Sequence, residues 1–256
     1  MKPSLREQVG PLARRSIARS LRQPILVVPS FVFPLFMLAV LSAAGGQVTK
    51  VPGFPTHSYL TFILGATLIM GATGAMNTAG SALASDIESG FLNRLALTRI
   101  NGVALVSAQL AGVAVLGAIQ ATLTLVIGLA GGAHVKAGVG GAVTLIPLVV
   151  LIVLAFGAVG VYVAVKSGSA TGVQSLSALG IALLFMSSMV MPRNLISADW
   201  FKQIATYNPT SYLVEATRSL FVTGWDGEAL ALGCGVSLVV LILALSGAVL
   251  TMGRRL

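Results

Sequence analysis

Six long stretches of this chain contain no Asp, Glu, Lys, Arg or His, and this pattern restricts its possible folds more than any other feature. They lie at residues 25–44, 59–82, 103–130, 142–165, 173–191 and 229–252. A helix needs about 20 mostly apolar residues to cross the hydrocarbon core of a bilayer. The sequence therefore predicts an all-α polytopic membrane protein with six transmembrane helices.

The low charge content argues against a soluble fold. Only 9% of the residues are charged, whereas about a quarter of the residues of a soluble domain are charged. The six predicted spans leave no room for a separate soluble domain, so we expect one transmembrane domain over residues 1–256. The net charge of +9 comes with no basic stripe and interleaved aromatic residues, which argues against nucleic-acid binding.

Residues 1–24 carry six basic side chains and are expected to lie at the membrane surface. Pro11 can begin a helix and Pro24 ends it, and the residues between them predict an amphipathic helix on the inner leaflet. A solvated basic leader is the alternative. The apolar stretch that follows is longer than the core of a usual signal peptide, so we expect it to be the first span.

The distribution of charge also predicts the orientation. Six spans place both termini on one side of the membrane. That side, with the loops at 83–102 and 166–172, holds eleven basic residues, against five on the other side. Because basic residues accumulate in cytoplasmic loops, we expect both termini to be cytoplasmic.

The sequence offers no catalytic or metal-ligating cluster. Cys234 lies alone in an apolar stretch, and His57 and His134 are far apart in predicted loops. The nearest approach to a Walker A motif, residues 160–167, has Val165 where the phosphate loop needs its second glycine. We therefore expect no cofactor in this chain, and any ATP to bind another polypeptide. Spans without ionisable groups also disfavour ion-coupled transport.

A polar segment at residues 85–99 separates the second and third predicted spans. Ile87, Phe91 and Leu95 share one face of a predicted helix, and charged residues lie elsewhere on it. Gly90 permits a close backbone approach or a helix break. Simple connections between spans are usually shorter than this, so we interpret the segment as a cytoplasmic helix that docks against a partner. A solvated helix that only joins two spans is the alternative.

Residues 192–228 differ from the predicted spans, because they contain seven charged residues and both tryptophans. Ser197 and Thr210 are candidate N-caps of two short helices, and Asn208-Pro209 predicts the break between them. Helices of this length do not cross a bilayer. We therefore expect them to lie at the membrane interface or to re-enter the membrane on the extracytoplasmic side.

Two parts of the chain resemble a known family. The segment DIESGFLNRL, from Asp86 to Leu95, resembles the cytoplasmic coupling segment of ABC type-2 exporter permeases. Met191-Pro192 and the later YNPTSYLVEATR, from Tyr207 to Arg218, resemble the family signature that precedes the last span. The chain is similar to permeases of daunorubicin-type drug-resistance exporters, although Thr98-Arg99 stands where many relatives have a proline.

The resemblance implies a half-permease. Two copies, or one copy with a homologous permease, would assemble with two ABC ATPase subunits that bind ATP and Mg. The residues at or near the ATPase contact would be Asp86, Glu88, Gly90, Phe91 and Arg94. The signature residues in outward-facing re-entrant helices would be Asn208, Pro209, Glu215 and Arg218. Glu215 and Arg218 are expected to pair at i and i+3, in a structural role or in contact with cargo.

These observations predict a permease subunit of an ATP-driven exporter in the bacterial plasma membrane. Spans without charged groups favour an amphipathic drug-like or lipid-like cargo, taken from the cytoplasm or the inner leaflet. The sequence identifies no substrate-binding residue. An ATP-independent membrane channel or carrier and a non-transporting membrane scaffold are the alternatives.

Overall fold

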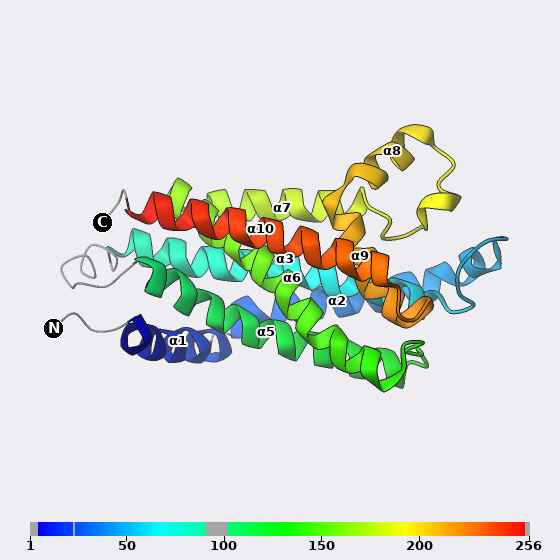
Figure 1. The fold of residues 1–256 in the computed structure, drawn as a ribbon, viewed down its shortest axis with the longest axis horizontal. Coiled ribbons are helices and arrows are strands. Elements are labelled where there is room, and N and C mark those ends of the chain that lie inside the picture. The colour runs from blue at the N-terminus through cyan, green and yellow to red at the C-terminus, as the bar shows by residue number, and fades with distance from the viewer. Residues whose placement is uncertain (1–4, 23, 91–101, 254–256) are drawn as a thin grey trace.

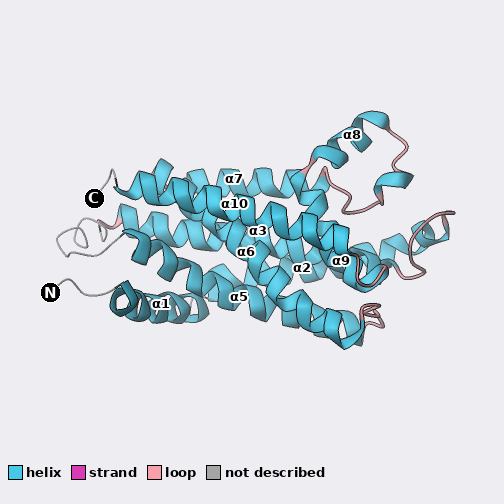
Figure 2. Ribbon diagram, viewed as in Figure 1, coloured by secondary structure: helices cyan, strands magenta, loops and turns pink. Residues whose placement is uncertain are grey.

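The structure is a computed structural model that describes residues 5–22, 24–90 and 102–253. Within these ranges it contains helices and connecting loops but no strand (Figure 2). The elements in chain order are α1 (Leu5–Arg22), α2 (Pro24–Ala44), η1 (Gly45–Lys50), α3 (Tyr59–Glu88), α5 (Gly102–Ala130), α6 (Gly138–Ser167), α7 (Ala170–Phe185), η2 (Arg193–Leu195), α8 (Asp199–Tyr207), α9 (Pro209–Val222) and α10 (Gly227–Gly253). The predicted all-α fold is confirmed.

Five helical stretches of the described chain are long and apolar enough to cross a membrane. The first begins in α2 and the others are α3, α5, α6 and α10, and each overlaps one of the six stretches predicted from the sequence. Most large side chains on α2 and α10 that face outward are apolar, among them Phe36 and Leu243. In lipid such a surface has no hydrophobic cost.

The predicted span at 173–191 differs from the other five. Helix α7 has 16 residues and ends at Phe185, which gives a length of about 24 Å against a hydrocarbon core of about 30 Å. A turn at Met186–Met189 follows, in which the Ser187 hydroxyl donates to the Leu184 carbonyl. The uncharged run is therefore longer than the helix, because it continues through a turn in which Ser187, Ser188 and Met189 are buried.

Figure 1 shows the helices aligned in a bundle whose two ends differ. We call one the α1 end: it holds the start of α1 and the ends of α3 and α10. The opposite end, the α8 end, holds η1, the turn between α5 and α6, α8 and the end of α9. The described beginning and end of the chain therefore lie at the same end of the bundle.

Helix α1 begins at Leu5, six residues before the predicted start at Pro11, which lies inside the helix. It packs mainly against α5, where the Ser16 hydroxyl donates to the Gln109 carbonyl at 3.3 Å. Arg14 and Arg15 on the same helix are exposed. The helix thus packs one face against α5, while these two basic side chains stay largely exposed.

Helix α3 forms the centre of the bundle and is buried along most of its length. It contacts α2, α5, α6, α7 and α9. Two glycines allow its close crossing with α6. A side chain on Gly160 of α6 would overlap the Met76 carbonyl oxygen, and a Cβ on Gly80 of α3 would lie 2.7 Å from the Gly160 carbonyl oxygen. Small residues of this kind let membrane helices approach closely.

A polar contact joins α3 to α5 within the apolar core. Gln120 Nε2 donates to the Leu68 carbonyl at 3.3 Å, and its amide occupies the space that a side chain on Gly71 would need. Gln120 is 6% exposed. A buried amide needs such a hydrogen bond, because an unsatisfied polar group in hydrocarbon is costly.

Replacement of Gly160 by alanine should lower the thermal midpoint of the detergent-purified protein. The new methyl group would overlap the Met76 carbonyl and push α6 away from α3, and overpacking of this kind costs about 1–3 kcal/mol. Gly235→Ala in α10 is the matched control, because open space surrounds Gly235. Equal midpoints for the two variants would show that the crossing does not need a glycine at position 160.

Candidate functional site

The acidic residues of the predicted coupling segment lie at the α1 end. Residues 85–88 form the last turn of α3, so this part of the predicted segment continues a span and does not begin a separate helix. Gly90 has a φ of +68°, which glycine adopts without strain, and it follows the end of α3. Phe91 and Arg94 lie outside the described residues. Three of the five predicted coupling residues can therefore be placed.

Asp86 connects α3 to α1. Its Oδ1 lies 3.9 Å from Nη2 of Arg15, and the two side chains are 13% and 47% exposed. An ion pair this open to solvent contributes little stability, on the order of 0–1 kcal/mol. Sequence reasoning did not connect these residues, because 71 positions separate Arg15 from Asp86. The pair marks a place where α1 and the end of α3 lie close together.

Glu88 connects α3 to α7. Its Oε1 accepts a hydrogen bond from the backbone N–H of Ala170, the first residue of α7, at 3.2 Å. The hydroxyl of Ser169 accepts from the N–H of Gly172 at the same helix start. A carboxylate near a helix N-terminus satisfies a free N–H group and interacts favourably with the helix dipole. The end of α3 is thus joined to the start of α7.

Asn208 joins α7 and α9. Its Oδ1 accepts from the N–H of Thr210 at 2.9 Å and caps α9, while its Nδ2 donates to the Leu183 carbonyl in the last turn of α7 at 2.6 Å. Pro209 occupies the first position of α9, where its missing N–H costs nothing. The break predicted at Asn208-Pro209 is confirmed. The prediction of Thr210 as the cap was wrong, because Asn208 occupies that position.

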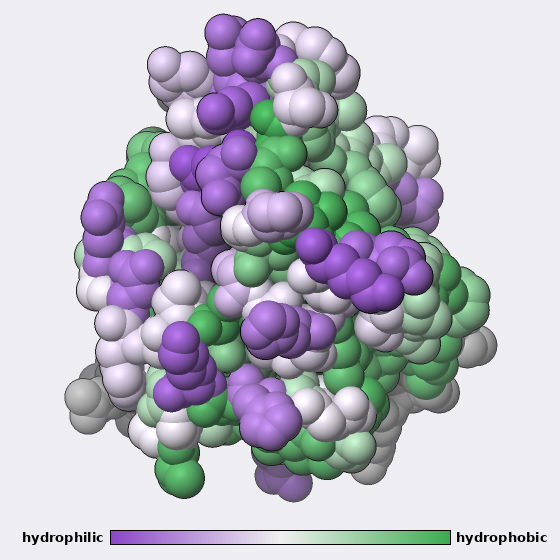
Figure 3. Space-filling model, turned by 90° about the vertical axis from the view of Figure 1, so that its right-hand side faces the viewer, coloured by the Kyte–Doolittle hydropathy of each residue, from purple (hydrophilic) through white to green (hydrophobic). Residues whose placement is uncertain are grey.

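The start of α8 also differs from the prediction. Ala198, not Ser197, is the N-cap residue, and no side chain caps the helix. Trp200, Ile204 and Tyr207 are exposed along one face at helical spacing. This face lies at the α8 end, where hydrophilic and hydrophobic residues are mixed on the surface (Figure 3).

The predicted ion pair between Glu215 and Arg218 is absent from the described structure. Glu215 pairs with Arg193 of η2 instead: Arg193 Nε lies 2.7 Å from Glu215 Oε1. The Arg193 guanidinium also lies over the ring of Tyr212, 4.6 Å from its centroid. The folded chain brings η2 beside α9. Glu215 therefore pairs with Arg193, 22 positions away, and not with Arg218, three positions away.

Arg218 points into the bundle. Its Nε donates to the Phe62 carbonyl at 3.1 Å, its Nη2 donates to the Met189 carbonyl at 2.8 Å, and its guanidinium carbon lies 3.6 Å from the Phe62 ring centroid. Burial lowers the pKa of Arg218 to about 9, and the charge of Glu215 opposes that change. The side chain therefore stays charged at neutral pH and ties α9 to α3 and to the turn after α7.

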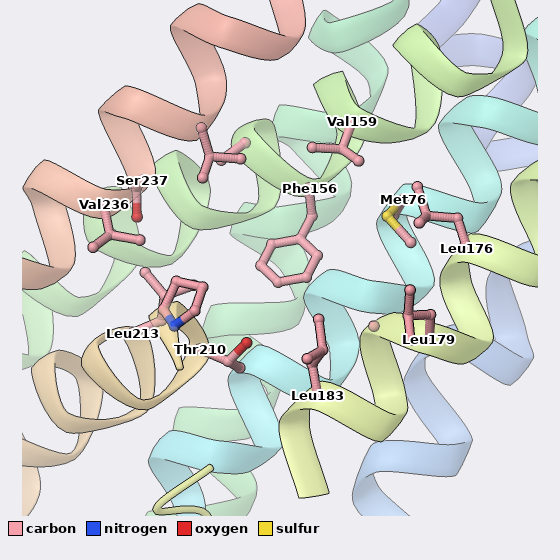
Figure 4. Close-up of a pocket in the computed structure, with 14 residues that line it drawn as sticks. Met76, Phe156, Val159, Leu176, Leu179, Leu183, Thr210, Leu213, Val236 and Ser237 are labelled. Atoms are coloured by element: carbon pink, nitrogen blue, oxygen red, sulfur yellow. The ribbon is translucent and has the colours of Figure 1, made fainter. Parts of the chain in front are cut away.

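An apolar groove of about 160 Å³ opens between α7 and α10, and we call it the α7–α10 groove. The Phe156 ring of α6 lies in the middle of its lining, flanked by side chains of α7 and α10 (Figure 4). Its lining residues are Met76, Ala155, Phe156, Val159, Leu176, Leu179, Gly180, Leu183, Pro209, Thr210, Leu213, Val236, Ser237 and Val240. None is charged, so the groove suits an apolar group.

The sequence pointed to Pro209 and Thr210 for other reasons, but it did not predict a cavity, because apolar side chains on five helices give no local signal of a shared groove. It also missed Arg193, although Arg193 directly follows the Met191-Pro192 part of the quoted signature. Its place next to this motif was the one sequence signal that could have identified Arg193 as a site residue. The pairing itself depends on the turn after α7, which brings η2 back over α9.

Comparison with known proteins gave one family. The family model described as ABC-2 type transporter matches residues 7–222, a range that runs from α1 to the end of α9 and includes residues 85–99 and 207–218. The curated proteins include no match to this chain.

Replacement of Asn208 by alanine should destabilise the protein more than replacement by serine. Serine can still cap α9, whereas alanine loses both the cap, worth about 1 kcal/mol, and the hydrogen bond to Leu183, worth a similar amount. Thermal midpoints in detergent measure the difference, and Asn194→Ala, at an exposed position, is the control. Equal midpoints for the alanine variant and this control would contradict the role of Asn208.

Proposed function

Because the chain belongs to the ABC-2 type transporter family, we propose that it is the permease subunit of an ATP-driven exporter. The match over residues 7–222 carries this proposal, since it includes most of the chain. The five long apolar helices fit a permease that crosses the membrane. ATP and Mg would bind a separate ABC ATPase subunit, of which two copies would serve each complex.

Two copies of this permease, or one copy with a homologous permease, would form the transmembrane unit. The α1 end would face the cytoplasm of a bacterial cell, with the protein in the inner membrane. Its excess of basic residues supports this orientation. Helix α7 and the turn after it would complete a sixth pass, and α8 and α9 would form the outward-facing interfacial and re-entrant pair.

Coupling to the ATPase would occur at the α1 end, through Asp86, Glu88, Gly90, Phe91 and Arg94. The hydrogen bond from Ala170 N–H to Glu88 supports a direct route from this contact to the cargo path. A displacement of the end of α3 would also displace the start of α7 through this hydrogen bond. Because α7 lines the α7–α10 groove, the displacement would reach the groove. Closure of the ATPases on ATP would then reshape the groove.

The cargo would be an amphipathic drug-like or lipid-like molecule. The uncharged lining of the groove supports an apolar portion of the cargo at this site, and its opening on the side of the bundle permits entry from the bilayer. Drug resistance of the daunorubicin type is one role of such an exporter. The alternative functions are an ATP-independent channel or carrier and a non-transporting scaffold.

Reversal of the charge at Glu88 should weaken association with the ATPase. Glu88→Arg and Phe91→Asp are expected to lower the amount of ATPase that co-purifies with the permease at least tenfold, or about 1.4 kcal/mol. Glu88→Gln keeps an oxygen for the Ala170 N–H and should have a smaller effect. Glu228→Arg, an equal charge reversal at the α8 end, is the control and should leave association unchanged.

Normal association and transport in both Glu88→Arg and Phe91→Asp would refute the coupling role. Mass spectrometry of the gently extracted wild-type protein tests the larger proposal. A stoichiometric partner with a Walker A motif would support it. A preparation without such a partner, under conditions that preserve a known ABC complex, would favour the channel or the scaffold.

Filling the α7–α10 groove should reduce transport without affecting assembly. Leu179→Trp places an indole at the groove, where Leu179 lines the opening. We expect at least a fivefold loss of efflux in cells, with an unchanged amount of co-purified ATPase. Leu232→Trp on the exposed part of α10, outside the lining, is the control. Equal efflux by the two variants would exclude this groove from the cargo path.

A further inference from the structure

A second pocket lies at the α8 end and is separate from the α7–α10 groove. It has a volume of about 370 Å³, and its lining includes Phe62 of α3, Arg193 of η2, Glu215, Arg218 and Thr223 around the end of α9, and Asp226 before α10. We call it the arginine pocket. Its size is within the range of small-molecule sites, about 300–1,000 Å³.

Arg218 is the most deeply buried charged side chain of this pocket, at 6% exposure. Within the residues that the structure describes, no carboxylate forms an ion pair with it. Two carbonyl groups accept from its Nε and Nη2, but Nη1 has no hydrogen-bond acceptor in the same part of the chain. A buried guanidinium without a counter-ion is costly, so this arrangement leaves an attraction for an anion.

Arg193 provides a second unused donor. Its Nε lies 2.7 Å from Glu215 Oε1 in an ion pair, but Nε and Nη2 are both buried without a hydrogen-bond partner among the described residues. A buried donor in this state loses its hydration without compensation. Both arginines that line the pocket thus retain at least one nitrogen for an external acceptor.

The two acidic residues of the lining are both engaged with the protein. Glu215 forms an ion pair with Arg193, and Asp226 Oδ1 accepts from the N–H of Ala229 at 3.0 Å in the first turn of α10. One arginine charge therefore has no partner of its own in the pocket. A guanidinium presents planar, directed donors, and phosphate oxygens are acceptors that match this geometry well.

We propose that the arginine pocket binds a phosphate group, carried by a membrane lipid headgroup or free in solution. The pocket lies at the α8 end, where hydrophilic residues are interspersed with hydrophobic ones on the surface (Figure 3) and the long apolar helices end. Headgroup phosphates lie at this level of a bilayer, outside the hydrocarbon core. The site requires neither the α7–α10 groove nor an ATPase partner.

Titration of the purified protein in an uncharged detergent tests this site. The probes are short-chain phosphatidic acid, the matching diacylglycerol without phosphate, and inorganic phosphate, all at constant ionic strength, with the thermal midpoint as the readout. We expect a saturable rise with phosphatidic acid and none with diacylglycerol. A similar rise with inorganic phosphate would identify free phosphate as a ligand, and its absence would identify the lipid headgroup.

Variants separate this pocket from other surfaces. Arg218→Gln should abolish binding, but it also removes the contacts of α9 with α3 and can unfold the protein. Thr223→Glu adds a negative charge at an exposed position of the lining and should weaken phosphatidic acid binding at least tenfold. Ser197→Glu, exposed and outside the lining, should change it less than twofold. Equal affinities for these two variants, or no saturable effect of either phosphate probe, would overturn the proposal.

Discussion

The crossing of α3 with α6 at Gly80 and Gly160 sets the positions of the other helices. Between apolar helices in lipid there is little hydrophobic drive, so close contact and hydrogen bonds must hold them together. Helix α3 can be surrounded on all sides because glycines lie at its crossings. At the α9 crossing, the Thr217 hydroxyl donates to the Gly65 carbonyl at 3.2 Å, and a Cβ on Gly65 would lie 2.8 Å from the backbone nitrogen of Arg218.

Helix α7 is attached at both of its ends by polar side chains from other elements. Glu88 of α3 accepts from its first N–H, and Asn208 donates to a carbonyl of its last turn. Between these points α7 lines one side of the α7–α10 groove. A short helix held in this way can move as a unit with its attachments. This arrangement gives the proposed coupling a physical path that does not depend on contacts inside the apolar core.

Local chemistry explains which interpretations of the sequence succeeded. The long uncharged stretches specified α2, α3, α5, α6 and α10, and proline specified the break at Asn208-Pro209. The interpretations that failed each required a choice between two candidate residues. These were Asn208 or Thr210 as the cap of α9, and Arg193 or Arg218 as the partner of Glu215. In both cases the chain offered two suitable groups. Only the path of the turn between α7 and α9 selected one.

The sequence by itself determined that this chain is helical and crosses a membrane, because uncharged stretches of this length satisfy their backbone groups in lipid only as helices. It also determined the family, through motifs read along the chain. The tertiary structure decided where α7 ends, which arginine pairs with Glu215, and that Arg218 is buried without an acidic partner in the described chain. These outcomes depend on contacts between residues far apart in sequence, and a local pattern does not specify such contacts.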